Sequence, residues 1–220
     1  MDAISRRGLA LALVLALLTS AGCVGFVTGN GPLTFEASPA SATNATLSET
    51  GYHLQRQQSM EMNRTVSVAG QSRSVHVTNY VAVYARSADV EMPADTPSGP
   101  TGGMVVVVST PKASVAGQGL NPLGTAPIEK ILTLVPGLLP GSSSVQRVEQ
   151  VRSRPVTMLG SETTLRTFEV TAERDGTTAT SSMALARVED DGDYVLVLAV
   201  FPPGNHDDDG VVRLLDGLRH

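Results

Sequence analysis

The stretch TSSMALARVEDDGDYVLVLAVF, Thr180–Phe201, decides the fold of this 220-residue chain. Two strand-like runs flank Asp191-Gly192, and this pair suits a type I′ turn because Asp and Gly tolerate positive φ at low cost. The second run, Val195–Phe201, is continuously apolar, which is typical of a strand in the centre of a sheet. The stretch therefore predicts an antiparallel hairpin inside a larger sheet.

Further strands are predicted on the N-terminal side of this hairpin. Val66 and Val68 alternate with polar residues, and the alternation resumes at Val75 and Val77 after a short break, as in a second hairpin. Met104–Val108 is an unbroken apolar run, which predicts a buried strand. Shorter strands are predicted over Val145–Val151, Pro155–Leu159 and Thr164–Thr171.

Three segments favour helices. In Thr125–Leu139 apolar residues recur at helical spacing until Pro136 ends the run. Asp207–Asp209 open a C-terminal helix, where negative charge stabilises the first turn. Ser38–Thr50 is small and polar, and Gly51 is placed to end a short helical turn. Together the elements predict one α+β domain, a mainly antiparallel β-sheet with two or three helices packed on it.

The first 23 residues predict export from the cytoplasm. Arg6 and Arg7 precede an apolar run, Leu9–Leu18, and small residues then lead to Cys23, the only cysteine. A charged start, a short apolar stretch and small residues before a cut are typical of a secretory signal. Paired arginines indicate the twin-arginine route. The small residues followed by Cys23 resemble a lipobox, so we expect cleavage before Cys23 and lipidation of its side chain.

The alternative is an uncleaved membrane anchor, because the run of twenty residues from Gly8 to Val27 carries no charge and has about the length that crosses a bilayer. Either way, the folded part is expected on the extracytoplasmic face of the membrane. We predict a signal peptide over residues 1–22, a lipid-anchored tether over 23–50 and the α+β domain over 51–220. One acyl chain anchors a protein only marginally, so we expect a two-chain lipid on Cys23.

The composition excludes one class of partner. The chain has 16 Lys and Arg against 21 Asp and Glu, a formal net charge of −5, whereas a nucleic-acid partner would call for a basic patch. Lys112 and Lys130 are the only lysines, and there is no tryptophan. A mildly acidic, lysine-poor chain rich in Ala, Val, Thr and Gly is typical of an organism that lives at high salt.

Six segments carry a resemblance to known proteins. They are GFVTGNGPLTFEASPA (Gly25–Ala40), LSETGYH (Leu47–His53), VAGQSRSVHVTNY (Val68–Tyr80), STPKASVAGQGLNP (Ser109–Pro122), LGSETTLRTFEV (Leu159–Val170) and VVRLLDGLRH (Val211–His220). These segments resemble a family of haloarchaeal surface lipoproteins whose shared domain has no known function. The resemblance implies a location and a kind of organism but no chemistry.

The order of strands and helices is also similar to that of the α/β/α sandwiches of the Mog1/PsbP-like group. That group includes photosystem assembly proteins and mycobacterial surface lipoproteins. The similarity implies an architecture, and it implies no function because one fold serves many functions.

An acidic stretch near the C-terminus has two interpretations. NHDDDGVVRLLD, Asn205–Asp216, has oxygen-bearing side chains, a glycine and a closing acid at the spacing of an EF-hand calcium loop. Asn at the first position, Asp in place of the closing Glu and a preceding strand weaken this match, so the sequence favours a plain helix start. A second cluster, Glu189–Asp193, is predicted to be a solvated hairpin tip, because its acids fall within one turn.

The sequence contains no recognised catalytic motif. We find no GxSxG nucleophile elbow, HExxH, P-loop or dinucleotide-binding fingerprint. The four histidines have no metal-ligand spacing, and no cofactor or metal is expected. N-x-[ST] triplets make Asn44 and Asn63 possible N-glycosylation sites.

The expected function is that of a non-catalytic surface lipoprotein that binds an envelope protein or a small ligand. One alternative is an extracytoplasmic hydrolase whose catalytic residues are scattered along the sequence. The other is a purely structural component of the envelope.

Overall fold

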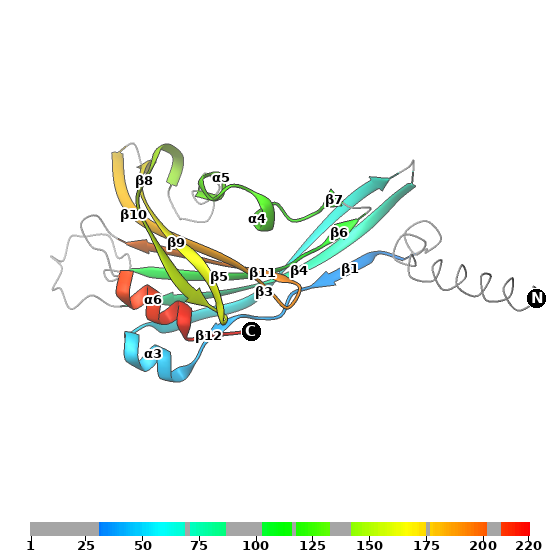
Figure 1. Ribbon diagram of the computed structural model, residues 1–220. Coiled ribbons are helices and arrows are strands. Elements are labelled where there is room, and N and C mark those ends of the chain that lie inside the picture. The colour runs from blue at the N-terminus through cyan, green and yellow to red at the C-terminus, as the bar shows by residue number, and fades with distance from the viewer. Residues whose placement is uncertain are drawn as a thin grey trace, which may run out of the picture.

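The structure, a computed structural model, describes residues 31–68, 71–86, 103–115, 118–132, 142–174, 177–201 and 208–220. Strands make up most of these residues, and eight of the strands form one large sheet (Figure 1). The predicted export signal at Arg6 and Arg7 and the predicted lipidation of Cys23 concern residues outside the described ranges.

The large sheet has the spatial order β3-β4-β5-β11-β10-β9-β8, and β1 lies beside the first part of β4. All of these neighbours are antiparallel except β1 and β4, which are parallel. The strand bounds are β1 Leu33–Glu36, β3 His53–Val68, β4 Gln71–Ala85, β5 Met104–Pro111, β8 Ser142–Met158, β9 Ser161–Arg174, β10 Thr177–Asp190 and β11 Asp193–Phe201.

Two smaller pairs of strands and several short helices complete the described part. The pairs are β2 (Ser41–Ala42) with β12 (Leu218–Arg219), and β6 (Ser114–Val115) with β7 (Gln118–Gly119). The helices are α3 (Asn44–Thr50), α4 (Pro122–Thr125), α5 (Ile128–Leu132) and α6 (Asp208–Asp216).

The predicted central hairpin is confirmed as β10 and β11. Asp191 and Gly192 join the two strands with φ of 45° and 85°, the positive values that a type I′ turn requires. β11 pairs with β10 on one side and with β5 on the other, and every residue from Val195 to Ala199 is buried. A strand buried on both faces needs a continuous apolar sequence, which is what Val195–Phe201 provides.

Helices cover both faces of the sheet, as Figure 1 shows for α6 and α5. On the face that we call the α6 face, buried side chains of α6 join one apolar cluster with Tyr84 of β4 and Phe201 of β11. On the opposite face, the α5 face, buried side chains of α5 pack with Phe168 of β9 and Leu185 of β10. The predicted single domain with a mainly antiparallel sheet and short helices is therefore confirmed. The similarity to the Mog1/PsbP-like group stays a prediction.

Residues 33–50 belong to the fold, although the sequence predicts a tether over 23–50. β1 pairs with β4 along Leu33–Glu36, and β2 pairs with β12. The predicted helical turn is confirmed as α3, where the Thr43 side chain accepts the Thr46 N–H and Gly51 ends the helix with a φ of 71°. Strands of two and four residues are too short to show an alternation in the sequence.

The predicted helix Thr125–Leu139 is wrong at its start. Thr125 is the last residue of α4, and α5 begins at Ile128 directly after Pro127. Proline has no N–H to continue a helix but suits the beginning of one, and the Pro127 carbonyl accepts the Ile131 N–H at 3.2 Å. Residues 133–141, which include the predicted end, lie outside the described residues.

The two strands predicted over 145–159 form the single strand β8. Pro155 lies within this strand, although the sequence predicts that a new strand begins there. β8 is an outer strand of the sheet, and a proline is tolerated there because no neighbour needs its missing N–H.

Substituting Gly217→Ala is expected to lower the free energy of unfolding by about 2 kcal/mol, the usual scale of overpacking. Gly217 is buried at the end of α6, and a Cβ there would overlap the side chain of Thr46 in α3. Denaturant unfolding measures the change. Gly119→Ala is the control, because nothing lies within 4 Å of its added Cβ.

The double variant Gly217→Ala with Thr46→Ala should recover part of the loss, because the overlapping side chain is removed. Strictly additive losses in the two single variants would contradict this account of how α3 and α6 pack.

Candidate functional site

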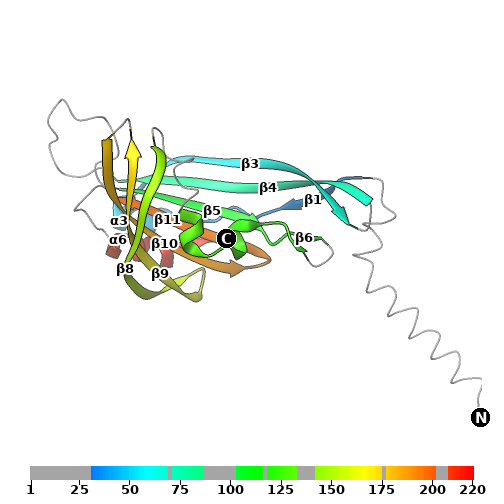
Figure 2. The same cartoon turned by 90° about the horizontal axis from the view of Figure 1, so that it is seen from above.

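β3 forms one outer edge of the large sheet (Figure 2). It pairs with β4 along its whole length, from His53 opposite Ala85 to Val68 opposite Gln71, and with no other described strand. One row of N–H and C=O groups on β3 therefore faces away from the sheet. An edge of this kind is a template for pairing with an extended segment of another chain.

Both faces of β3 are exposed. Every residue from His53 to Thr65 is exposed, and these include Leu54 at 45%, Met60 at 43% and Met62 at 43%. Among the described residues, Val151 is the one other large hydrophobic side chain that is exposed. Apolar side chains gathered on an exposed surface indicate an interaction site.

The opposite edge strand, β8, carries features that hinder pairing. Its register against β9 shifts at three places, between Ser142/Ser144, Val145/Arg147 and Gln150/Arg152. Pro155 removes one N–H from the strand. Bulges, prolines and charges are the usual means by which proteins protect an edge strand.

Helix α6 also holds β8 through two ion pairs. Arg152 lies 2.6 Å from the Asp208 carboxylate, whose side chain is 7% exposed, and Arg154 lies 3.1 Å from that of Asp209. β3 has one register shift, near its start between Leu54 and Arg56, and it contains no proline. Its charged residues Arg56, Glu61 and Arg64 form no ion pair with the residues that the structure describes, unlike the arginines of β8. The two edges of the sheet therefore differ, and β3 is the open one.

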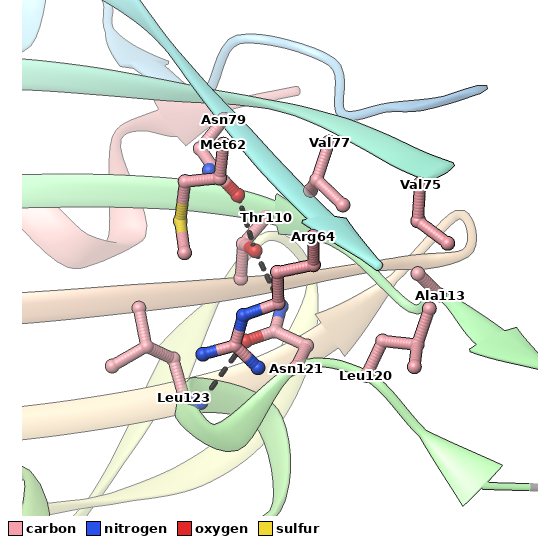
Figure 3. Close-up of a pocket in the computed structure, with 10 residues that line it drawn as sticks. All are labelled: Met62, Arg64, Val75, Val77, Asn79, Thr110, Ala113, Leu120, Asn121 and Leu123. Atoms are coloured by element: carbon pink, nitrogen blue, oxygen red, sulfur yellow. Dashed lines mark hydrogen bonds between the residues drawn. The ribbon is translucent and has the colours of Figure 1, made fainter. Parts of the chain in front are cut away.

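A small apolar cavity adjoins β3 on the α5 face (Figure 3). Its volume is about 60 Å³, whereas pockets for whole ligands are typically about 300–1,000 Å³. It therefore has room for part of one side chain. The lining residues are Met62, Arg64, Val75, Val77, Asn79, Thr110, Ala113, Leu120, Asn121 and Leu123.

Three polar residues of the cavity wall are joined by hydrogen bonds. Thr110 Oγ1 donates to Asn79 Oδ1 at 2.6 Å, and Asn79 Nδ2 donates to the Met60 carbonyl at 3.3 Å. Asn121 Nδ2 donates to Thr110 Oγ1, and Asn121 Oδ1 accepts the Leu123 N–H at 3.0 Å. This chain of bonds connects β3, β4 and β5 to the segment that covers the cavity. Figure 3 shows its links from Asn79 through Thr110 and Asn121 to Leu123.

The Arg64 guanidinium lies beside this wall, as Figure 3 shows. It forms no hydrogen bond or ion pair with any residue in the described part of the chain. The cavity and β3 together thus combine free backbone groups, exposed methionines and one available cation. Such a surface can bind an extended peptide.

A second polar cluster ties the C-terminal residue to the hairpin of β10 and β11. The His220 side chain is 6% exposed, with Nδ1 at 3.0 Å from Asp190 Oδ2 and Nε2 at 3.1 Å from Asp193 Oδ2. Asp193 Oδ2 also accepts the Ser38 N–H at 2.7 Å. The Nε2 atom also lies 3.1 Å from the Ser38 carbonyl oxygen, so both ring nitrogens of His220 are engaged within the fold.

The prediction that Glu189–Asp193 forms a solvated hairpin tip is therefore wrong for part of the cluster. Asp193 is buried, and Asp190 and Asp193 both hold His220. Glu189 and Asp191 are exposed as expected. No local pattern could reveal the contacts of His220, because they join segments that are far apart in the sequence.

The acidic stretch Asn205–Asp216 begins a helix, as the sequence favoured. α6 occupies Asp208–Asp216, and Asp208 and Asp209 bind arginines of β8. A helix cannot supply the looped backbone of an EF-hand site. Residues 205–207 lie outside the described part. In the described ranges no group of three or more His, Cys, Asp or Glu is placed to hold a metal ion.

The two possible glycosylation sites are both exposed. Asn44 is the first residue of α3, and Asn63 lies on β3. Their occupancy stays a prediction, as do the roles of Arg6, Arg7 and Cys23. Of the helices in the described residues, none has the length and apolar character needed to cross a membrane.

Substituting Thr110→Val is expected to lower the free energy of unfolding by about 1–3 kcal/mol, the cost of leaving buried polar partners unsatisfied. Thr110 is 1% exposed and bonds to both Asn79 and Asn121. Thr110→Ser keeps the hydroxyl and should lose much less. Equal losses in the two variants, measured by denaturant unfolding, would show that the hydroxyl is dispensable.

Comparisons with known proteins give a family but no activity. No curated protein matches the sequence. The crystal structure of a protein of unknown function from Pseudomonas aeruginosa matches at 12% identity over 64% of this chain and 83% of that one, with a TM-score of 0.26, too low to carry an argument. The model of a domain of unknown function, DUF6517, matches residues 39–219. This confirms the expected membership of an uncharacterised domain family: the chain belongs to the DUF6517 family.

Proposed function

We propose that the protein is a non-catalytic binding protein of the cell envelope, and that it holds an extended segment of a partner protein along β3. The observation that carries this proposal is the contrast between the two edges of the sheet. β3 is a 16-residue strand exposed on both faces, whereas β8 has bulges, a proline and ion pairs to α6. Main-chain hydrogen bonds to an open edge give affinity, and alternate side chains give specificity.

The N-terminal sequence supports attachment to the membrane through a lipid on Cys23. Leu33 pairs with Val75 near the turn of the β3–β4 hairpin, so the chain enters the fold at that end (Figure 1). Nine residues separate Cys23 from Leu33, so the ten steps between them reach about 35 Å when fully extended. An anchor of this length would leave β3 accessible to other proteins at the membrane surface. The resemblance to haloarchaeal surface lipoproteins agrees with this location.

Two other functions have less support. The cavity of about 60 Å³ beside β3 is too small for a whole ligand. Two larger hollows, of about 410 Å³ beside Arg187 and about 480 Å³ beside His220, are open to solvent and mainly polar, whereas ligand sites are mostly apolar. A hydrolase that used His220 as its base would need a free ring nitrogen, and both ring nitrogens of His220 are engaged.

Intact mass spectrometry of the protein from native membranes tests the anchor. We expect a mature chain that starts at Cys23 and carries a two-chain lipid, and a Cys23→Ser variant that lacks this modification. An uncleaved chain, or an unmodified Cys23, would contradict the proposed attachment.

Photo-crosslinking from the sheet edges tests the binding site. A crosslinking residue in place of Met60 on β3 is expected to capture a protein partner in native membranes. The same residue in place of Val151 on β8 is the matched control, because the two side chains are 43% and 50% exposed on opposite edges. Equal capture from both positions, or capture from Val151 alone, would contradict the assignment of β3.

A further inference from the structure

The side chains of β3 alternate between the two faces of the sheet, and the pattern differs between the faces. The register places Arg56, Gln58, Met60, Met62 and Arg64 opposite Val83, Val81, Asn79, Val77 and Val75. The last three of these β4 residues line the cavity on the α5 face, so the β3 series also lies on that face. On the α5 face β3 thus presents two methionines between two arginines.

The charges on this face of the hairpin have a single sign. Arg73 of β4 lies opposite Val66 and adds a third arginine to the face. β4 contains no Asp or Glu, and the one acid of β3, Glu61, lies opposite Thr78 on the α6 face. A positive strip on a chain of net charge −5 favours an acidic partner.

Arg56 and Arg64 are available to such a partner. Neither forms a hydrogen bond or ion pair with a residue that the structure describes. Seven residues of the extended strand separate them, so the eight steps span about 27 Å. Between them the exposed Met60 and Met62 offer apolar contact.

We propose that the segment bound by β3 carries two apolar residues on one face, flanked by acidic residues that lie opposite Arg56 and Arg64. This inference rests on the proposed function and specifies its partner. The segment has the pattern acidic-x-apolar-x-apolar-x-x-x-acidic in antiparallel pairing, with the apolar residues opposite Met62 and Met60. The residue opposite Met62 would contact that side chain, which itself lines the small cavity.

Two of the registers in which a second copy of the chain could pair with this edge bring like charges together. Antiparallel pairing of two β3 strands about Met60 would oppose Arg56 of one with Arg64 of the other. Pairing about Glu61 would oppose the two Glu61 side chains. Like charges directly opposite each other destabilise a pair of strands, which favours the acidic partner segment.

Binding of synthetic peptides to the full-length chain in detergent tests the inference. The acidic probe is Glu-Thr-Val-Thr-Val-Thr-Thr-Thr-Glu with blocked ends, and the matched control has Lys in place of both Glu residues. We expect the acidic probe to bind about tenfold more tightly in fluorescence anisotropy, because two attractive pairs replace two repulsive ones. Added salt should reduce this preference, because these charges are exposed.

Variants of the chain show whether the two arginines cause the preference. The double variant R56E/R64E should prefer the lysine probe, whereas R147E on β8 should keep the preference of the unchanged protein. Both sites are exposed, and circular dichroism verifies that each variant is folded.

Equal affinity for the two probes, or no binding of either, would overturn the inference. So would a preference that R56E/R64E leaves unchanged, or light scattering that shows dimerisation through β3. The crosslink from Met60 tests separately whether β3 binds a partner at all. The failure of the inference and the failure of the proposed function can therefore be distinguished.

Discussion

β11 packs apolar side chains against both layers of the molecule, and the rest of the sheet extends outward from it. Val195 and Val197 are buried in the cluster with α6, while Leu196 and Leu198 are buried in the cluster with α5. A strand in this position needs a hydrogen-bonded neighbour on each side, because buried backbone groups without partners cost free energy. β10 and β5 supply these partners, and each of them in turn needs a further neighbour.

The extension of such a sheet must end, and the two ends differ here. On one side β8 ends the sheet with bulges, Pro155 and ion pairs to α6. On the other side the long hairpin of β3 and β4 leaves a regular strand in water. An open edge risks aggregation, so a protein that keeps one is expected to use it.

The sequence predicted the elements whose own residues determine them. The hairpin at Asp191-Gly192, the turn of α3 at Gly51 and the C-terminal helix were all predicted from local chemistry, and the structure confirms them. β1 was missed because its four residues are held by pairing with β4 rather than by a pattern of their own. Asp193 was placed in water because its partner, His220, is distant in the sequence.

The candidate site was also beyond local analysis. The hairpin of β3 and β4 was predicted from Val66, Val68, Val75 and Val77, but alternation does not say which strand lies at the edge. That depends on β5 and β1 both pairing with β4, which leaves β3 outside. A retrospective signal is the stretch QQSMEMN at Gln57–Asn63, where polar residues occupy one face and two methionines the other.

Hydrogen exchange of the edge strands in native membranes, compared with the purified chain, tests the central claim most directly. If β3 holds a partner segment, its amides that face away from β4 exchange more slowly in the membranes, and those of β8 exchange at the same rate in both samples. The account is contradicted if β3 exchanges equally fast in both samples, or if the protection falls on β8 instead.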